Sequence, residues 1–233
     1  MSTVPWRRGC GGGDGVFEDR NEAGRKLAKA VAETVDAPNA DAQVWVLALA
    51  RGGVPVAAHV AAQLHAPLDV TIARKLGVPG QPEWAFGAIA PGGVALFDDE
   101  VIGAAHVTDA QQHAAVERET QEMQRRLERY RDGRPEPDLK GAVVVLVDDG
   151  VATGSTMRAA VASVRQRHPA WLVVAVPAGP RDTIEQLRGE VDALVCLERP
   201  SPFYAVGQAY RSFPQVTDEE VQRTLASAWG VGG

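Results

Sequence analysis

Continuous apolar runs alternate along the chain with segments of helical periodicity, and this alternation predicts the fold. The apolar runs lie at 43–50, 67–73, 142–147, 171–176 and 193–197. Apolar positions recur at helical spacing over 18–35, 54–64, 108–131, 155–167 and 181–187. Buried strands separated by helices are typical of a parallel sheet covered on both faces. The pattern therefore predicts an α/β fold, with a doubly wound, mostly parallel sheet and helices on both of its faces.

The segment 75–137 interrupts this alternation. Residues 77–93 hold five glycines and three prolines without periodicity, which predicts a long flexible loop with a short hairpin at its end. The helix that follows is the most polar of those predicted, and Thr108 can cap it together with Gln111 in a capping box. We therefore predict that 75–137 is a flexible loop and helical elaboration of the sheet.

Length and composition narrow the class of protein. The 233 residues suit one domain at 16–233, and the glycine-rich residues 1–15 are predicted to form a flexible N-terminal tail. No apolar run approaches the roughly 18 residues of a membrane span. The formal charge of −6 disfavours nucleic-acid binding, which needs a basic surface. The two distant cysteines, Cys10 and Cys196, are typical of a reducing compartment, so a cytoplasmic location is expected.

The stretch VVVLVDDGVATGSTMRAAV, residues 143–161, carries the most chemistry. A buried strand ends at the carboxylates Asp148 and Asp149, and a short loop then leads through a Thr-Gly-Ser-Thr string into a helix. Backbone N–H groups, hydroxyls and the helix dipole together form an anion site, and Gly154 lets a phosphate approach the backbone. Carboxylates beside a phosphate cradle suit a ribose 5-phosphate.

A plainer alternative is that the two acids only terminate the strand and the hydroxyls only cap the helix. The sequence contains no GxxxxGK[ST] loop, which disfavours a P-loop nucleotide hydrolase. No GxGxxG follows a predicted strand, so a Rossmann dinucleotide site is not supported.

The string VLVDDGVATGST resembles the phosphoribosyl-pyrophosphate signature of type I phosphoribosyltransferases, and ALARGGVPVA resembles their pyrophosphate loop. The likeness implies that Asp148 and Asp149 hold the ribose hydroxyls and that Arg51 faces the pyrophosphate, with Gly52 and Gly53 giving backbone access. It implies a 5′-phosphate site formed by Ala152, Thr153, Gly154, Ser155 and Thr156. The segments FEDRNEAG, ARKLGVPGQPEWAFGAIA and SPFYAVGQAY extend the likeness, to a bacterial subgroup of the family, over nearly everything after Phe17.

This resemblance implies an enzyme that transfers a phosphoribosyl group to a nitrogenous acceptor and releases pyrophosphate. Lys75, Glu83 and Asp149 are the catalytic candidates, and Phe203 and Tyr204 are candidates for acceptor binding. Mg²⁺ is the implied cofactor, and the resemblance implies either no direct protein ligand for it or contact with Asp148 and Asp149 through the ribose-bound ion.

The acceptor stays open. Ala152 stands where enzymes for 6-oxopurines commonly carry an acid, which puts a hypoxanthine or guanine acceptor in doubt. The expected partners are phosphoribosyl pyrophosphate and a small-molecule acceptor, without nucleic acid or membrane, and a homodimer is left open. Two other functions on the same fold also stay open: a non-catalytic sensor of phosphoribosyl pyrophosphate or a nucleotide, and a hydrolase or phosphatase.

Overall fold

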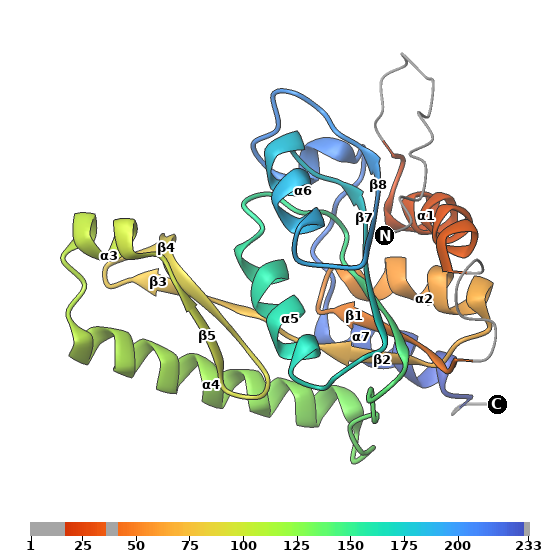
Figure 1. Ribbon diagram of the computed structural model, residues 1–233, viewed down its shortest axis with the longest axis horizontal. Helices are drawn as coiled ribbons and strands as arrows, with labels where there is room; N and C mark the ends of the chain where they lie inside the picture. Colours follow the sequence, from red (N-terminus) through yellow and green to blue (C-terminus); the bar gives the residue numbers. More distant parts are fainter. Residues whose placement is uncertain (1–16, 36–41, 231–233) are drawn as a thin grey trace.

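A computed structural model describes residues 17–35 and 42–230, and a five-stranded parallel sheet forms its centre (Figure 1). The strand order is β2-β1-β6-β7-β8, and every neighbouring pair is parallel. The strands are β1 (Val44–Leu49), β2 (Leu68–Thr71), β6 (Val143–Val147), β7 (Trp171–Ala178) and β8 (Ala193–Glu198). The predicted parallel sheet is confirmed. The predicted tail at 1–15 lies outside the described residues.

Helices cover both faces of this sheet, as the continuous apolar strands require. They are α1 (Arg20–Val35), α2 (Gly53–Leu64) and α7 (Asp218–Ala228) on one face, and α5 (Ser155–Arg165) and α6 (Arg181–Arg188) on the other. Successive residues of β1 point into different cores. Val46 belongs to the core that contains Leu27 of α1, whereas Leu47 belongs to the core that contains Met157 of α5 and Ile184 of α6. The doubly wound α/β class is therefore confirmed.

The prediction of a long loop at 77–93 is wrong. This region forms a second, antiparallel sheet of β3 (Arg74–Val78), β4 (Gln81–Ala90) and β5 (Val94–Phe97). Glycine obscured the strands because two of the glycines lie inside them, where the backbones approach closely. A Cβ on Gly77 would lie 2.8 Å from the Pro82 carbonyl oxygen, and one on Gly87 would lie 2.4 Å from the Leu96 carbonyl oxygen.

The predicted polar helix is confirmed as α4 (Asp109–Arg131), and it begins with the expected capping box of Thr108 and Gln111. α4 runs from the antiparallel sheet back to the parallel sheet (Figure 1), and one ion pair at its middle and one at its end hold it to the two sheets. Glu119 pairs with Arg74 of β3, and Arg131 pairs with Asp69 of β2. The short helices α3 (Asp99–Ala105) and η1 (Val206–Ala209) and the C-terminal α7 were not predicted.

Cys196 lies on β8, where burial raises the pKa of its thiol to about 11, so it behaves as a small apolar residue. No helix among the described residues is both long and apolar enough to cross a membrane.

Candidate active site

The two acids lie at the carboxyl end of the central strand β6, the edge at which open α/β sheets bind ligands. Asp149 is buried and Asp148 is partly exposed, and the Asp149 N–H donates to Asp148 Oδ1 over 2.8 Å. They border a cavity of about 450 Å³, called here the acid-pair cavity. Its lining residues are Arg20, Ala50, Arg51, Gly52, Asp148, Asp149, Val206, Phe213, Gln215 and Val216.

Arg20, which the sequence analysis did not single out, is central to this cavity. Its Nε donates to Asp149 Oδ2 over 2.8 Å, and its Nη1 donates to the Pro214 carbonyl over 2.6 Å. The guanidinium also stacks on the Phe213 ring, 3.8 Å from the ring centroid. The only sequence signal was its position in FEDRNEAG, at the start of the first helix. Its partners are 129 and 194 residues away, so no local pattern could reveal the contacts.

Burial controls the electrostatics of the acid pair. It raises the pKa of Asp148 well above the usual range, and the neighbouring Asp149 charge acts in the same direction. Burial also raises the pKa of Asp149, but the Arg20 guanidinium opposes this by favouring the carboxylate. Arg20 is therefore the group that makes a buried charge on Asp149 tolerable.

The glycine pair after β1 packs directly against the acid pair. A Cβ on Gly52 would lie 2.0 Å from Asp149 Oδ2, and one on Gly53 would lie 2.6 Å from the Val147 carbonyl oxygen. Neither position can carry a side chain without displacing the acids. The structure thus joins two segments that are about 100 residues apart in the sequence and that the family resemblance assigned to one ligand.

Arg51 lines the same cavity but also reaches the start of α7. The Ala50–Arg51 peptide bond is cis. Arg51 Nη1 lies 3.4 Å from Asp218 Oδ1, and that oxygen also accepts a hydrogen bond from the Tyr130 hydroxyl over 2.6 Å. The hydrogen bond from Tyr130 and the nearby arginines lower the pKa of Asp218. Asp218 therefore connects the loop after β1 with α4 and α7.

The Thr-Gly-Ser-Thr string forms the turn between β6 and α5. Gly154 has a φ of +81°, a backbone conformation that favours glycine, and it precedes the first residue of α5. The lack of a side chain would also leave the backbone open to an approaching phosphate. Thr153 and Ser155 hydroxyls lie 3.0 Å apart, and Thr183 donates to the Ala152 carbonyl over 2.9 Å. Both hydroxyl groups and the helix N-terminus lie at the same edge of the sheet as the acid pair.

The remaining candidates lie elsewhere. Lys75 on β3 and Glu83 on β4 are exposed on the antiparallel sheet, and neither lines the acid-pair cavity. Tyr204 is 79% exposed. Phe203 packs beside the buried cluster of Phe17, Ala178 and Tyr210. The aromatic side chain that does line the cavity is Phe213, ten residues further along the chain than Phe203.

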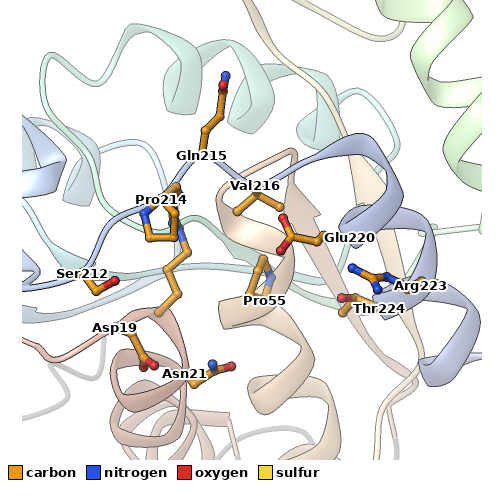
Figure 2. Close-up of a pocket in the computed structure, with 11 residues that line it drawn as sticks. Asp19, Asn21, Pro55, Ser212, Pro214, Gln215, Val216, Glu220, Arg223 and Thr224 are labelled. Atoms are coloured by element: carbon orange, nitrogen blue, oxygen red, sulfur yellow. Dashed lines mark hydrogen bonds between the residues drawn. The ribbon is translucent and has the colours of Figure 1, made fainter.

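A second cavity, of about 410 Å³, adjoins the first between α1, α2 and α7 (Figure 2). We call it the α1–α7 cavity. It shares Arg20, Gln215 and Val216 with the acid-pair cavity. Pro55 of α2 and Glu220 of α7 are both among its lining residues (Figure 2).

The acid pair fits a Mg²⁺ ion that takes most of its ligands from a substrate. Carboxylate oxygens suit Mg²⁺, which usually keeps few protein ligands and binds substrate phosphates. Among the described residues, no three His, Cys, Asp or Glu side chains are grouped to hold a metal ion by themselves. Asp148 and Asp149 would therefore face an ion that the ligand brings with it.

A parallel α/β sheet with an acid pair, a glycine pair and a helix N-terminus along its carboxyl edge defines a class of domain suited to phosphorylated ligands. The family model of the phosphoribosyl transferase domain matches residues 17–210. The chain therefore belongs to this family, and the sequence-based identification of the family is confirmed.

Individual relatives agree with this identification. Two Mycobacterium tuberculosis proteins, from strains CDC 1551 and H37Rv, bear the provisional name phosphoribosyl transferase. Each is 47% identical to this chain over 213 residues, which cover 91% of this chain and 47% of the relative. The chain thus spans about half the length of the curated relatives it matches. The crystal structure of TT1426 from Thermus thermophilus has 41% sequence identity and a TM-score of 0.73, covering 91% of this chain and 98% of that chain.

Proposed function

We propose that this domain transfers a phosphoribosyl group from phosphoribosyl pyrophosphate to a nitrogenous acceptor, with release of pyrophosphate and with Mg²⁺ as cofactor. The observation that carries the proposal is the packing of Gly52 and Gly53 against Asp148 and Asp149 beside one cavity. It brings a backbone-accessible loop and a pair of hydroxyl-binding carboxylates to the same ligand.

Each part of the ligand has a matching group. Asp148 and Asp149 accept hydrogen bonds from the ribose 2′- and 3′-hydroxyls. Residues 152–156, at the N-terminus of α5, bind the 5′-phosphate through backbone N–H groups and hydroxyls. Arg51 binds the pyrophosphate, because its side chain lines the cavity. Its guanidinium can leave the Asp218 carboxylate and pair with phosphate oxygens in its place.

In the transfer step, the acceptor nitrogen attacks the anomeric carbon while the bond from that carbon to the pyrophosphate oxygen breaks. Pyrophosphate leaves with the bonding electrons, and the proton of the acceptor N–H passes to water. Arg51 stabilises the negative charge that grows on the leaving oxygens. Mg²⁺ bound to the pyrophosphate would supply further charge neutralisation.

Lys75 and Glu83 take part only if the β3–β4 hairpin moves towards the cavity. Such a closure would exclude water, whose attack on the activated sugar competes with transfer. Phe203 and Tyr204 stay candidates for acceptor contact under the same condition, that their segment moves. Asp149, in contrast, needs no movement to reach the ribose.

The experiment compares the wild-type protein with an Asp148→Asn, Asp149→Asn double variant. Calorimetric titration with Mg²⁺ and phosphoribosyl pyrophosphate should show affinity at least 100-fold weaker in the variant, because two charge-assisted hydrogen bonds contribute about 3 kcal/mol or more. The matched control replaces two exposed acids that follow one another in α3, Asp99→Asn with Glu100→Gln. This variant should keep the wild-type affinity for phosphoribosyl pyrophosphate.

Pyrophosphate release is then followed with purine, pyrimidine and amine acceptors. Release that depends on an acceptor supports transfer. Unchanged affinity in a folded double variant would contradict the site, and tight binding without acceptor-dependent release would contradict transfer and favour the sensor.

A further inference from the structure

The α1–α7 cavity lies next to the acid pair but has no role so far. The Arg20 side chain joins the two cavities, because it lines both and its Nε bonds Asp149. Gln215 and Val216 also line both. A second reactant in the α1–α7 cavity would therefore lie beside the carboxylate expected to hold the ribose.

The acid-pair cavity itself has no free aromatic face for a planar acceptor. Arg20 stacks on the Phe213 ring 3.8 Å from its centroid, and Tyr210 stacks on the same ring with centroids 4.8 Å apart. Two groups at these distances occupy both faces of one ring. Phe203 and Tyr204 line neither cavity. An acceptor must therefore be recognised by something other than stacking on Phe213.

The α1–α7 cavity offers hydrogen-bond acceptors instead. Asp19 and Glu220 both line it, and each uses one carboxylate oxygen to cap a helix. Asp19 Oδ1 accepts from the Glu22 N–H, and Glu220 Oε2 accepts from the Thr217 N–H. The second oxygen of each carboxylate has no hydrogen bond within the described part of the chain. In Figure 2, Glu220 points towards the space between Val216 and Pro55.

The balance of charge in this cavity is negative. Its two arginines are Arg20 and Arg223, and the Arg20 charge is already matched by Asp149. Two carboxylates thus face one remaining guanidinium. Such a lining binds N–H donors well and repels an anionic ligand. Its described lining residues include no aromatic ring, so recognition depends on hydrogen bonds.

We propose that the α1–α7 cavity is the acceptor site and that the acceptor is a neutral or cationic nitrogen compound with N–H donors, not a carboxylated one. This inference rests on the proposed function. Asp19 and Glu220 bind the N–H groups of the acceptor and direct its nucleophilic nitrogen past Arg20 towards the ribose.

The test variant is Asp19→Asn with Glu220→Gln. Both replacements keep an oxygen that can cap the helix, so the fold is retained while the two negative charges are removed. The matched control is Glu219→Gln, which removes an exposed charge from the same turn of α7 and does not line the cavity. Folding of each variant is checked by thermal unfolding and by the affinity for Mg²⁺ and phosphoribosyl pyrophosphate.

Acceptor-dependent pyrophosphate release is measured with adenine, cytosine, nicotinamide and ethanolamine, and with the carboxylated compounds orotate, nicotinate and anthranilate. The wild-type protein should use members of the first group only. The double variant should lose at least tenfold in kcat/KM for those acceptors, while its affinity for phosphoribosyl pyrophosphate stays within twofold. The control should match the wild type.

Two results would overturn the inference: preferred use of a carboxylated acceptor, or turnover unaffected by the double variant. A wild-type protein that does not bind phosphoribosyl pyrophosphate, or that binds it and turns over none of the acceptors, would instead contradict the proposed function, and the inference with it. The binding and turnover measurements therefore separate the two failures.

Discussion

At the scale of single residues, the site depends on two glycines, whose lack of a side chain leaves space, and on one arginine. Gly52 and Gly53 leave room for the acid pair, and Arg20 supplies the charge that matches buried Asp149. The side chains of Arg20 and Asp149 are only 10% and 11% exposed. Removing one partner of such a pair is costly because the other stays buried and uncompensated.

Gly52→Ala tests this packing. Gly52 has a φ of −58°, which alanine adopts freely, so the effect is purely steric. The new Cβ would lie 2.0 Å from Asp149 Oδ2 and must displace it. We expect a loss of about 1–3 kcal/mol in the free energy of unfolding and at least tenfold weaker binding of phosphoribosyl pyrophosphate, measured by urea unfolding and calorimetry.

The matched control is Gly103→Ala in α3, where a Cβ would meet nothing within 4 Å. It should be neutral or stabilising by up to about 1 kcal/mol, because alanine is favoured over glycine inside a helix. A folded Gly52→Ala protein with normal affinity would refute the close packing.

At the scale of elements, charged side chains hold α4 and α7 to the sheet and its loops. Arg131 at the end of α4 bonds Asp69 of β2, and its Nη2 also donates to the Val70 carbonyl over 3.1 Å. Asp218 at the start of α7 accepts a hydrogen bond from Tyr130 of α4 and forms an ion pair with Arg51. These contacts fix the end of α4 to β2 and join it, through Asp218, to the start of α7 and the loop after β1.

The Asp218–Arg51 contact predicts competition with an anionic ligand. Asp218→Asn should tighten the binding of inorganic pyrophosphate by about two- to fivefold, because a partly exposed ion pair contributes up to about 1 kcal/mol. In an Arg51→Gln background the same substitution should have no effect, so calorimetry on the four proteins measures the coupling. Equal effects in both backgrounds would mean that Asp218 acts independently of Arg51.

The Arg131–Asp69 pair predicts a pH-dependent loss of stability. Burial raises the pKa of Asp69, and the Arg131 charge opposes the rise. In Arg131→Met this pKa rises further, so the native state disfavours the carboxylate and loses stability as pH rises above about 4. We expect a cost of about 3 kcal/mol at pH 7 and a clearly smaller cost at pH 4, measured by urea unfolding.

Arg125→Met provides the comparison on the same helix. Arg125 bonds Glu122 on the exposed face, and such a pair contributes about 1 kcal/mol or less. The pKa of Glu122 is lowered to about 2 by its hydrogen bonds with Arg125 and Arg126, so Glu122 stays ionised at both pH values. The cost should therefore be small and the same at pH 4 and pH 7. A pH-independent cost in Arg131→Met would contradict the buried-pair explanation.

At the scale of the whole molecule, the antiparallel sheet with α3 and α4 projects from one side of the parallel sheet (Figure 1). Its base packs on α5, where Ala88 and Ala90 contact Ala159 in a small buried cluster. Towards its tip the contacts end, since Gln81, Pro82, Glu83 and Trp84 are exposed. A body fixed at one end in this way can move as a unit.

Hydrogen exchange tests whether the hairpin closes over the site. With Mg²⁺ and phosphoribosyl pyrophosphate bound, amides at 78–84 should exchange at least fivefold more slowly, together with those at 148–156. Protection at 148–156 alone would show that the ligand binds without closure, and would remove Lys75 and Glu83 from the catalytic candidates. The buried amides of β6 serve as the internal control, because they are protected in either state.

The sequence alone determined the parallel sheet, its covering helices and the segment that carries the acid pair and the Thr-Gly-Ser-Thr string. These depend on short-range patterns, namely apolar runs, helical spacing and strand-end motifs. The sequence did not predict the antiparallel sheet, because its glycines are placed by close backbone contacts between neighbouring strands. No local sequence pattern reports such contacts.

Only the tertiary structure decided which distant groups meet. It brought Arg20 to Asp149, Arg51 to Asp218 and the segment 212–216 between two cavities, through contacts that span more than a hundred residues. It also left Tyr204 exposed to solvent and placed Phe213, in its stead, among the residues that line the acid-pair cavity. Such choices depend on how whole elements pack, because burial and charge compensation are properties of the assembled core and not of any one segment.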